Sequence, residues 1–143
     1  MRYRVVALGG RGGGGSRMKS AALRAACDDY LSRIRHYAKV EEREVKEARI
    51  PEDSRLIALS QHGEGWTSEQ LAELTERWEL EGRDVTFAIG DADGLPEDIL
   101  KRAERTWSLG PLTLPHELAR VVVYEQLYRA YTIRRGEKYH RGS

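Results

Sequence analysis

The sequence has a single cysteine, Cys27, among 143 residues. An internal disulfide framework is therefore excluded, and such sparing use of cysteine is typical of a reducing compartment. The first ten residues are too short and too charged for a secretory signal, and no apolar run approaches the roughly 20 residues that a transmembrane helix needs. We therefore expect a cytoplasmic protein without a membrane partner.

The sequence also lacks a strong net charge. Its 24 lysines and arginines nearly balance 23 aspartates and glutamates, which leaves +1 at pH 7. No global basic field therefore points to a nucleic-acid partner. The local distribution is less even, because the last ten residues, RRGEKYHRGS, hold four basic residues, one histidine and one glutamate. Such a tail suits either a solvated terminus or an arm that contacts phosphates, with Tyr139 available to stack on a base.

Two common kinds of catalytic site have no support in the sequence. The four histidines, His36, His62, His116 and His140, show no paired spacing and no neighbouring cysteine cluster. We therefore expect no metal site. The G-x-S-x-G elbow is also absent, which argues against the nucleophile of an α/β-hydrolase.

The hydrophobic pattern predicts strands that alternate with helices. Apolar runs predict strands at 3–8, 54–60 and 84–89, and a short strand within 108–114. Helical periodicity predicts helices at 20–38, from 67 to 82, from 96 to about 107, and from about 116 onward. The charged segment 40–48 is compatible with a strand or with a helical connector. The alternation predicts one α/β domain over residues 1–143, with a mostly parallel sheet and helices on both faces.

Three loops are expected to gather at one edge of this sheet. They are QHGEG at 61–65, GDADG at 90–94 and LGPLTLP at 109–115. Each belongs to the carboxyl end of a predicted strand, where open parallel sheets bind their ligands. The glycines of the first two suit either ordinary turns or a backbone cradle for a small ligand. Asp91 and Asp93 favour a hydroxyl-rich or cationic ligand over an anion.

A glycine tract at residues 10–15 formally matches the G-x-G-x-x-G fingerprint of dinucleotide-binding folds. In a tract of five glycines such a match arises easily, and no acidic residue ends a clear second strand about 20 positions on, where a ribose-binding carboxylate is expected. We interpret the tract mainly as a loop and retain a nucleotide-binding α/β protein as one alternative.

The last predicted helix is apolar on more than one side. Its apolar and aromatic side chains are Val121, Val122, Val123, Tyr124, Tyr128 and Tyr131. Exposed apolar patches of this extent are rare on monomers. We therefore expect one side of the helix to pack on the sheet and another to contact a second copy of the chain.

Longer motifs in the second half of the chain carry a family resemblance. They are ELEGRDVTFAIGDADGL (79–95), TWSLGPLTLPHELARVVVYEQLYRAYTI (106–133) and GEKYH (136–140). From Leu56 onward the sequence resembles the ribosomal RNA large subunit methyltransferase H family of the SPOUT superfamily. The resemblance implies a parallel α/β sheet that ends in a C-terminal trefoil knot, and a homodimer.

The resemblance also implies an activity and a cofactor. It implies an S-adenosylmethionine-dependent enzyme that methylates N3 of a pseudouridine in helix 69 of 23S ribosomal RNA, on the assembled ribosome. It assigns the cofactor to the knot. The residues that match its cofactor loops are Leu59, Gly90, Asp91, Gly110, Pro111, Leu112, Thr113, Leu114 and Pro115. The stiff loop at 110–115 would then wrap the cofactor.

Methyl transfer to N3 requires in-line approach of the methyl donor and loss of the imide proton. The candidates for holding the base or taking the proton are Arg129, Tyr139 and His140, and His116 is less favoured because it follows Pro115 at a helix start. Arg129 and His140 are the catalytic candidates that we carry forward, Arg129 as a stabiliser of the developing negative charge and His140 as the base, although no sequence feature chooses among the set. The candidates for contact with RNA are Arg134, Arg135, Lys138, Tyr139 and Arg141. The tail of one subunit could serve the cofactor pocket of the other.

Three positions depart from the family pattern. Asp91 replaces a glycine, Lys138 stands where the tail usually has proline, and Ser60 replaces an aspartate. The departures keep a second interpretation open, in which the protein is a cofactor-deficient SPOUT relative that binds RNA or the ribosome without catalysis.

Overall fold

A five-stranded parallel sheet forms the centre of the computed structural model, which describes residues 1–9, 17–46, 49–91 and 93–141. The elements along the chain are β1 Arg2–Leu8, α1 Ala21–Ile34, β2 Lys39–Val45, β3 Arg55–Gly65, α2 Ser68–Glu81, β4 Val85–Ile89, α3 Glu97–Arg102, β5 Arg105–Ser108 and α4 His116–Arg134. The strand order is β2-β1-β4-β3-β5, and each neighbouring pair is parallel. The predicted α/β class with a parallel sheet is confirmed.

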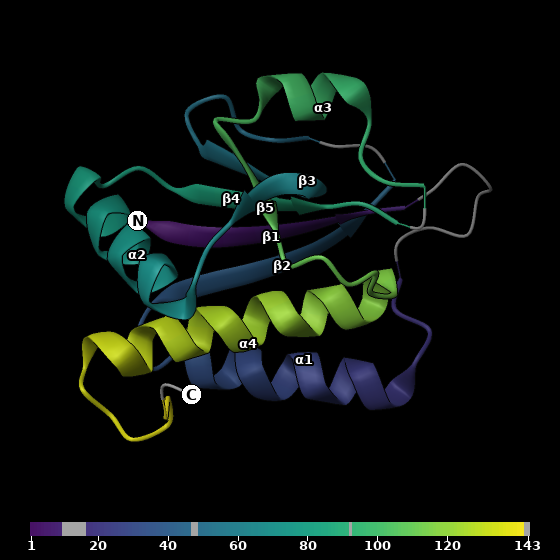
Figure 1. Cartoon of the computed structure of the whole chain (residues 1–143). Coiled ribbons are helices and arrows are strands. Elements are labelled where there is room, and N and C mark those ends of the chain that lie inside the picture. Colours follow the sequence, from purple (N-terminus) through teal and green to yellow (C-terminus); the bar gives the residue numbers. More distant parts are fainter. Residues whose placement is uncertain (10–16, 47–48, 92, 142–143) are drawn as a thin grey trace.

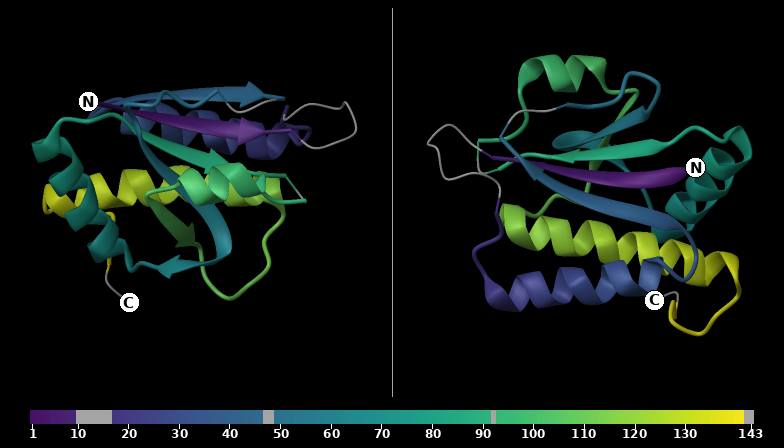
Figure 2. Two further views of the ribbon diagram at one scale, coloured as in Figure 1. Left: turned by 90° about the horizontal axis from the view of Figure 1, so that it is seen from above. Right: turned by 180° about the vertical axis from the view of Figure 1, so that it is seen from behind.

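Helices cover both faces of the sheet (Figure 1; Figure 2). α1, α2 and α4 lie on one face, where α4 contacts both of the others, and α3 lies on the opposite face. Because side chains alternate along a strand, Val5 and Phe87 enter the larger core under α4, whereas Leu56 and Ala88 meet Ile99 of α3. The prediction of helices on both faces is confirmed.

The charged segment after α1 forms the edge strand β2, and buried ion pairs hold it in place. Arg120 of α4 is 2% exposed, and its guanidinium nitrogens lie 2.9 Å from Glu42 and 3.0 Å from Glu44. Arg24 of α1 adds a contact of 2.6 Å to Glu42, and Tyr124 donates to the same carboxylate. Burial opposes ionisation of Glu42, but the hydrogen bonds from Arg24, Tyr124 and Arg120 outweigh it and lower the pKa of this carboxyl. The acidic residues of β2 therefore join an edge strand to two helices.

The end of α3 and the position of β5 differ from the prediction. The helix expected to reach about residue 107 ends at Arg102, and the strand expected within 108–114 occupies Arg105–Ser108. Trp107 is buried and stacks on Trp66 with 5.1 Å between ring centroids. Pairing of β5 with β3 and this stacking therefore override the local helical pattern.

The glycine tract at 10–15 lies outside the described residues. Its interpretations as a loop and as a nucleotide site both stay predictions. Within the ranges that the structure describes, no helix is long and apolar enough to cross a membrane.

Candidate functional site

A cavity of about 920 Å³ opens at the carboxyl ends of β3, β4 and β5. Its lining comprises residues 59–62, 89–91, 93–95, 107–110, 112–116, Leu100 and Ala119. The lining therefore comes from the strand ends, the loops that follow them and the first turn of α4. This edge of a parallel sheet is where α/β folds bind ligands, and the volume is within the usual range of small-molecule sites.

The structure brings together the residues that the resemblance assigned to a cofactor. Eight of the nine line the cavity, namely Leu59, Gly90, Asp91, Gly110, Leu112, Thr113, Leu114 and Pro115. Pro111 belongs to the same loop but is not part of the lining. Gln61 and His62 belong to a loop that the sequence analysis placed at this edge, and Ser60 was named there only as a departure from the family pattern. Trp107 and Ala119 were not named as site residues, although they lie near a strand end and near the predicted loop.

Ser60, Gln61 and His62 line the cavity because β3 changes register beside β5. Leu59 and Glu64 both pair with Trp107, so residues 60–63 form a bulge. The loop predicted at 61–65 is therefore wrong as a separate element, since these residues are the end of β3. Nε2 of Gln61 donates to Oγ1 of Thr113 at 3.4 Å and so connects the bulge to the loop before α4.

Gly63 lies where the bulge passes closest to β5. An added Cβ would lie 2.7 Å from the carbonyl carbon of Thr106 and 2.7 Å from the nitrogen of Trp107. Because both are backbone atoms, we expect Gly63→Ala to lower the free energy of unfolding by about 1–3 kcal/mol. Gly65→Ala is the matched control, since nothing lies within 4 Å of its added Cβ. Thermal unfolding followed by circular dichroism measures both, and equal midpoints would contradict this account of the bulge.

The loop after β4 is a tight turn whose residues face the cavity. Oδ1 of Asp91 accepts a hydrogen bond of 2.9 Å from the backbone N–H of Asp93, and the backbone N–H of Gly94 donates to the carbonyl of Asp91 at 2.9 Å. Gly94 has φ of +82°, which favours glycine. In the part of the chain that the structure describes, no group of three or more His, Cys, Asp or Glu side chains could hold a metal ion. The carboxylate of Asp91 therefore stabilises the turn, and both aspartates line the cavity.

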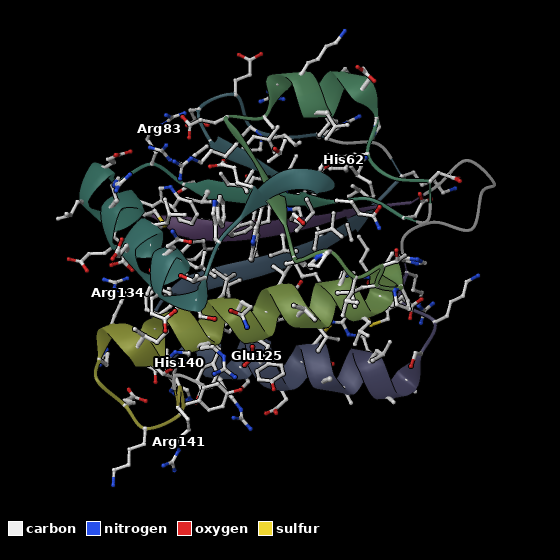
Figure 3. All side chains as sticks on the ribbon, in the orientation of Figure 1. His62, Arg83, Glu125, Arg134, His140 and Arg141 are labelled. Atoms are coloured by element: carbon white, nitrogen blue, oxygen red, sulfur yellow. The ribbon has the colours of Figure 1, made fainter. Side chains whose placement is uncertain are left out.

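A second set of polar residues, which we call the tail cluster, lies at the carboxyl half of α4. It consists of Glu69, Glu125, Arg129, Tyr139 and His140. Figure 3 labels two of these residues, Glu125 and His140. Arg129 donates to Glu125 at 2.9 Å and lies 3.0 Å from Nδ1 of His140. Tyr139 donates to Glu125 at 2.7 Å, and Nε2 of His140 lies 2.8 Å from Glu69. The predicted catalytic pair, Arg129 and His140, is thus in direct contact.

The hydrogen bonds of the tail cluster also favour its charged forms. The hydrogen bond with Glu125 raises the pKa of Arg129, so this guanidinium remains a cation. The hydrogen bond with His140 lowers the pKa of Glu69, so this carboxylate is ionised at neutral pH. The tail cluster therefore presents a fixed cation beside a histidine.

The other predicted RNA contacts differ in how freely they could bind. Arg134 donates to Glu79 at 2.7 Å and is already paired. Arg135, Lys138 and Arg141 have exposed side chains at the end of α4 and in the tail. Exposed cations are available to phosphates, whereas Arg134 would first have to leave Glu79.

The cavity and the tail cluster do not meet within one chain. Ala119 lines the cavity, and Arg129 follows it by ten residues on the same helix. That separation is about 15 Å along the helix axis at 1.5 Å per residue. In Figure 3, His140 lies beside Glu125 and well apart from His62, which belongs to the cavity. The predicted catalytic residues therefore stand away from the predicted cofactor residues of the same subunit.

An apolar face of α4 separates these two sites. Val123 and Tyr124 are buried in the core, and Val121 packs against it. Leu118 and Val122, one helical turn apart, are only half-buried. They lie on α4 between the cavity and the tail cluster, and Leu112 of the cavity lining adds a further apolar side chain that is 76% exposed.

Comparisons with known proteins identify the family of this chain. A family described as "Predicted SPOUT methyltransferase" matches residues 1–140. The chain is 44% identical over 150 residues to ribosomal RNA large subunit methyltransferase H of Sorangium cellulosum (strain So ce56), which covers 97% of this chain and 99% of that protein. It is 42% identical over 160 residues to the protein of the same name from Anaeromyxobacter sp. (strain Fw109-5), with 99% and 100% covered.

A solved structure supports the fold independently. A methylase family protein from Haemophilus influenzae Rd KW20 superimposes with a TM-score of 0.61 at 11% sequence identity, over 98% of this chain and 70% of that one. The fold and the matched family together define the class as SPOUT methyltransferases. Within that class, the chain belongs to the ribosomal RNA large subunit methyltransferase H family.

Proposed function

We propose that this protein transfers a methyl group from S-adenosylmethionine to N3 of a pseudouridine in helix 69 of 23S ribosomal RNA, on the assembled ribosome. Membership of the family supports the reaction class. The observation that carries the proposal for this chain is the cavity at the carboxyl edge of the sheet, lined by eight of the nine residues that match the cofactor loops. The C-terminal trefoil knot that the resemblance implies is part of the proposal.

The chemistry of the cavity lining fits S-adenosylmethionine. Leu59, Leu109 and Trp107 offer apolar surface to an adenine ring, and Asp93 offers a carboxylate to hydroxyl or ammonium groups. Gly110 has φ of +129°, so the loop before α4 takes a backbone conformation that residues other than glycine rarely adopt. When bound, the cofactor supplies an electrophilic methyl group on a sulfonium, and this chain supplies the position and the surrounding dipoles.

A homodimer would bring the two halves of the site together. We propose that Leu118 and Val122 form its centre, with the two α4 helices antiparallel about a two-fold axis near Val122. Pro115 at the cavity and Arg129 in the tail cluster are each seven residues from Val122, or about 10 Å along the helix. A two-fold operation exchanges these ends, so the tail cluster of one subunit would face the cavity of its partner.

In such a dimer the tail cluster would act on the nucleotide held at the partner's cavity. The guanidinium of Arg129 would stabilise the negative charge that develops as N3 loses its proton. His140 would accept that proton at Nδ1 once Arg129, which donates to this nitrogen in the free chain, turns to the nucleotide. Arg135, Lys138 and Arg141 would contact the neighbouring phosphates, and Tyr139 would stack on a base.

A second candidate function is RNA or ribosome binding without catalysis. Asp91, which takes the place of a family glycine and lines the cavity, favours it. Asp91→Gly separates the two functions when its affinity for S-adenosylmethionine is measured by calorimetry. We expect little change in cofactor affinity from the wild type, because the carboxylate of Asp91 already accepts a hydrogen bond from the backbone N–H of Asp93 at the cavity wall. A wild type that does not bind, together with a variant that does, would support the cofactor-deficient alternative instead.

A methyl-transfer assay tests the proposed function. Labelled S-adenosylmethionine is offered with unmodified ribosomes, separate large subunits or free RNA, and the product is mapped by mass spectrometry of helix 69. We expect about one methyl group per ribosome at a pseudouridine, with assembled ribosomes as the best substrate. A folded protein that binds the cofactor but methylates none of these substrates would contradict the proposal.

A further inference from the structure

A second cavity, of about 520 Å³, lies at the opposite edge of the sheet, where β1 and β2 begin. Among the described residues that line it are the cations Arg2, Arg35 and Lys39 and the neighbouring His36, and Glu41 is its single carboxylate. We call it the basic groove. It belongs to the carboxyl end of α1 and the start of β2, so it is separate from the cavity beside α4.

The charge of the basic groove is not neutralised by its own carboxylate. Glu41 already has arginine nitrogens nearby, 2.9 Å away on Arg4 and 3.2 Å away on Arg43, and Arg2 is more distant at 3.8 Å. Arg35 and Lys39 are exposed, and neither forms an ion pair with any residue of 1–9, 17–46, 49–91 or 93–141. Two cations are therefore free to bind an anion from outside.

Aromatic side chains join the basic groove to the tail cluster. The ring of Tyr37, which lines the groove, lies 6.2 Å from that of Tyr128, and Tyr128 lies 4.6 Å from Tyr139. The guanidinium of Arg135 stands 5.0 Å over the Tyr37 ring, and the Tyr37 hydroxyl donates to Glu137 at 2.9 Å. The carboxyl ends of α1 and α4 lie side by side in Figure 1 and Figure 2. The groove and the tail thus share one continuous surface.

We infer that the basic groove binds the phosphates of an RNA strand at a second site, away from the methyl-transfer pocket. Unpaired cations along a groove are what the phosphates of a nucleic-acid strand require, because each such contact releases condensed counterions from the strand. Because the basic groove and the tail cluster share one surface, the RNA would run from the groove toward the nucleotide that reacts. The inference rests on the proposed function, because it takes the RNA to be that substrate.

The test compares two double variants with the same change in charge. Arg35→Ala/Lys39→Ala removes the free cations of the groove. Arg77→Ala/Lys101→Ala is the matched control, because both residues are exposed and lie on α2 and α3. Arg35→Lys/Lys39→Arg keeps the charge and serves as rescue. For each protein, affinity for a helix 69 stem-loop RNA is measured between 0.05 and about 0.5 M salt, and methylation kinetics are measured on ribosomes.

We expect the groove variant to lose two phosphate contacts. The slope of log affinity against log salt should become shallower by about 1.5, and RNA affinity at about 0.1 M salt should fall roughly tenfold or more. KM for ribosomes should rise while kcat, cofactor affinity and the thermal midpoint stay at the wild-type values. The control and rescue variants should behave like the wild type.

Two different failures can be told apart. If the groove variant matches the control in salt slope and in RNA affinity, the inference is overturned, whatever the enzyme methylates. If the wild type binds RNA with the expected slope but methylates no ribosomal substrate, the proposed function fails and the groove remains an RNA site.

Discussion

A mixture of two inactive chains is expected to recover about one quarter of wild-type methylation through its mixed dimers. One chain carries Arg129→Ala and His140→Ala, which remove the predicted catalytic pair of the tail cluster. The other carries Ala119→Phe, which fills the cavity from the first turns of α4. In a dimer that shares its sites, the first chain's cavity meets the second chain's intact tail cluster. Each mixed dimer then has one working site out of two.

The value of one quarter follows from random mixing. About half of the dimers are mixed, and half of the sites in each mixed dimer are active. Methylation is measured at fixed total protein after denaturation and joint refolding. A reciprocal control places all three changes in one chain and mixes it with the wild type. Its mixed dimers should be inactive if sites are shared and half-active if each site lies within one chain. No recovery in the first mixture would contradict the shared site.

His140→Ala is expected to slow the methyl-transfer step by about 100-fold without changing affinity for S-adenosylmethionine. The reason is that the change removes the imidazole that is proposed to accept the N3 proton, while Arg129, 3.0 Å from Nδ1 of His140, stays in place. Single-turnover kinetics with unmodified ribosomes isolate this step. An unchanged rate would remove His140 from the mechanism.

Two further variants separate proton transfer from positioning. His140→Gln keeps a hydrogen-bonding side chain near Glu69 but does not accept the proton, so it should be as slow as His140→Ala. A rate for His140→Gln near the wild type would assign His140 a positioning role. Tyr139→Phe removes the hydroxyl that donates to Glu125 at 2.7 Å but leaves His140 in place, and it should have a much smaller effect.

Much of the fold could be predicted because its signals are local. Apolar runs marked β1, β3 and β4, and their alternation with helical periods was enough to indicate a parallel sheet. β2 stayed ambiguous because Glu42 and Glu44 look solvent-facing in the sequence. Their partner Arg120 lies more than seventy residues away, so only the folded chain shows why charged residues occupy an edge strand.

The candidate site was predicted unevenly for the same reason. The loop at 110–115 and the turn at 90–91 came from long family motifs, and these residues largely line one cavity. The bulge of β3 depends on its register with Trp107, which periodicity does not encode. The basic groove has no motif, because Arg2 and Arg35 meet only when β1 begins beside the end of α1.

The central claim is that a dimer of this chain binds S-adenosylmethionine in the cavity at the carboxyl edge of the sheet. Calorimetric titration of the purified protein, with its solution mass determined in parallel, tests this claim most directly. The account predicts a dimer that binds one cofactor per chain with micromolar affinity, and an Ala119→Phe dimer that binds none. A folded wild-type dimer that releases no heat of binding and shows no affinity for the cofactor would contradict it.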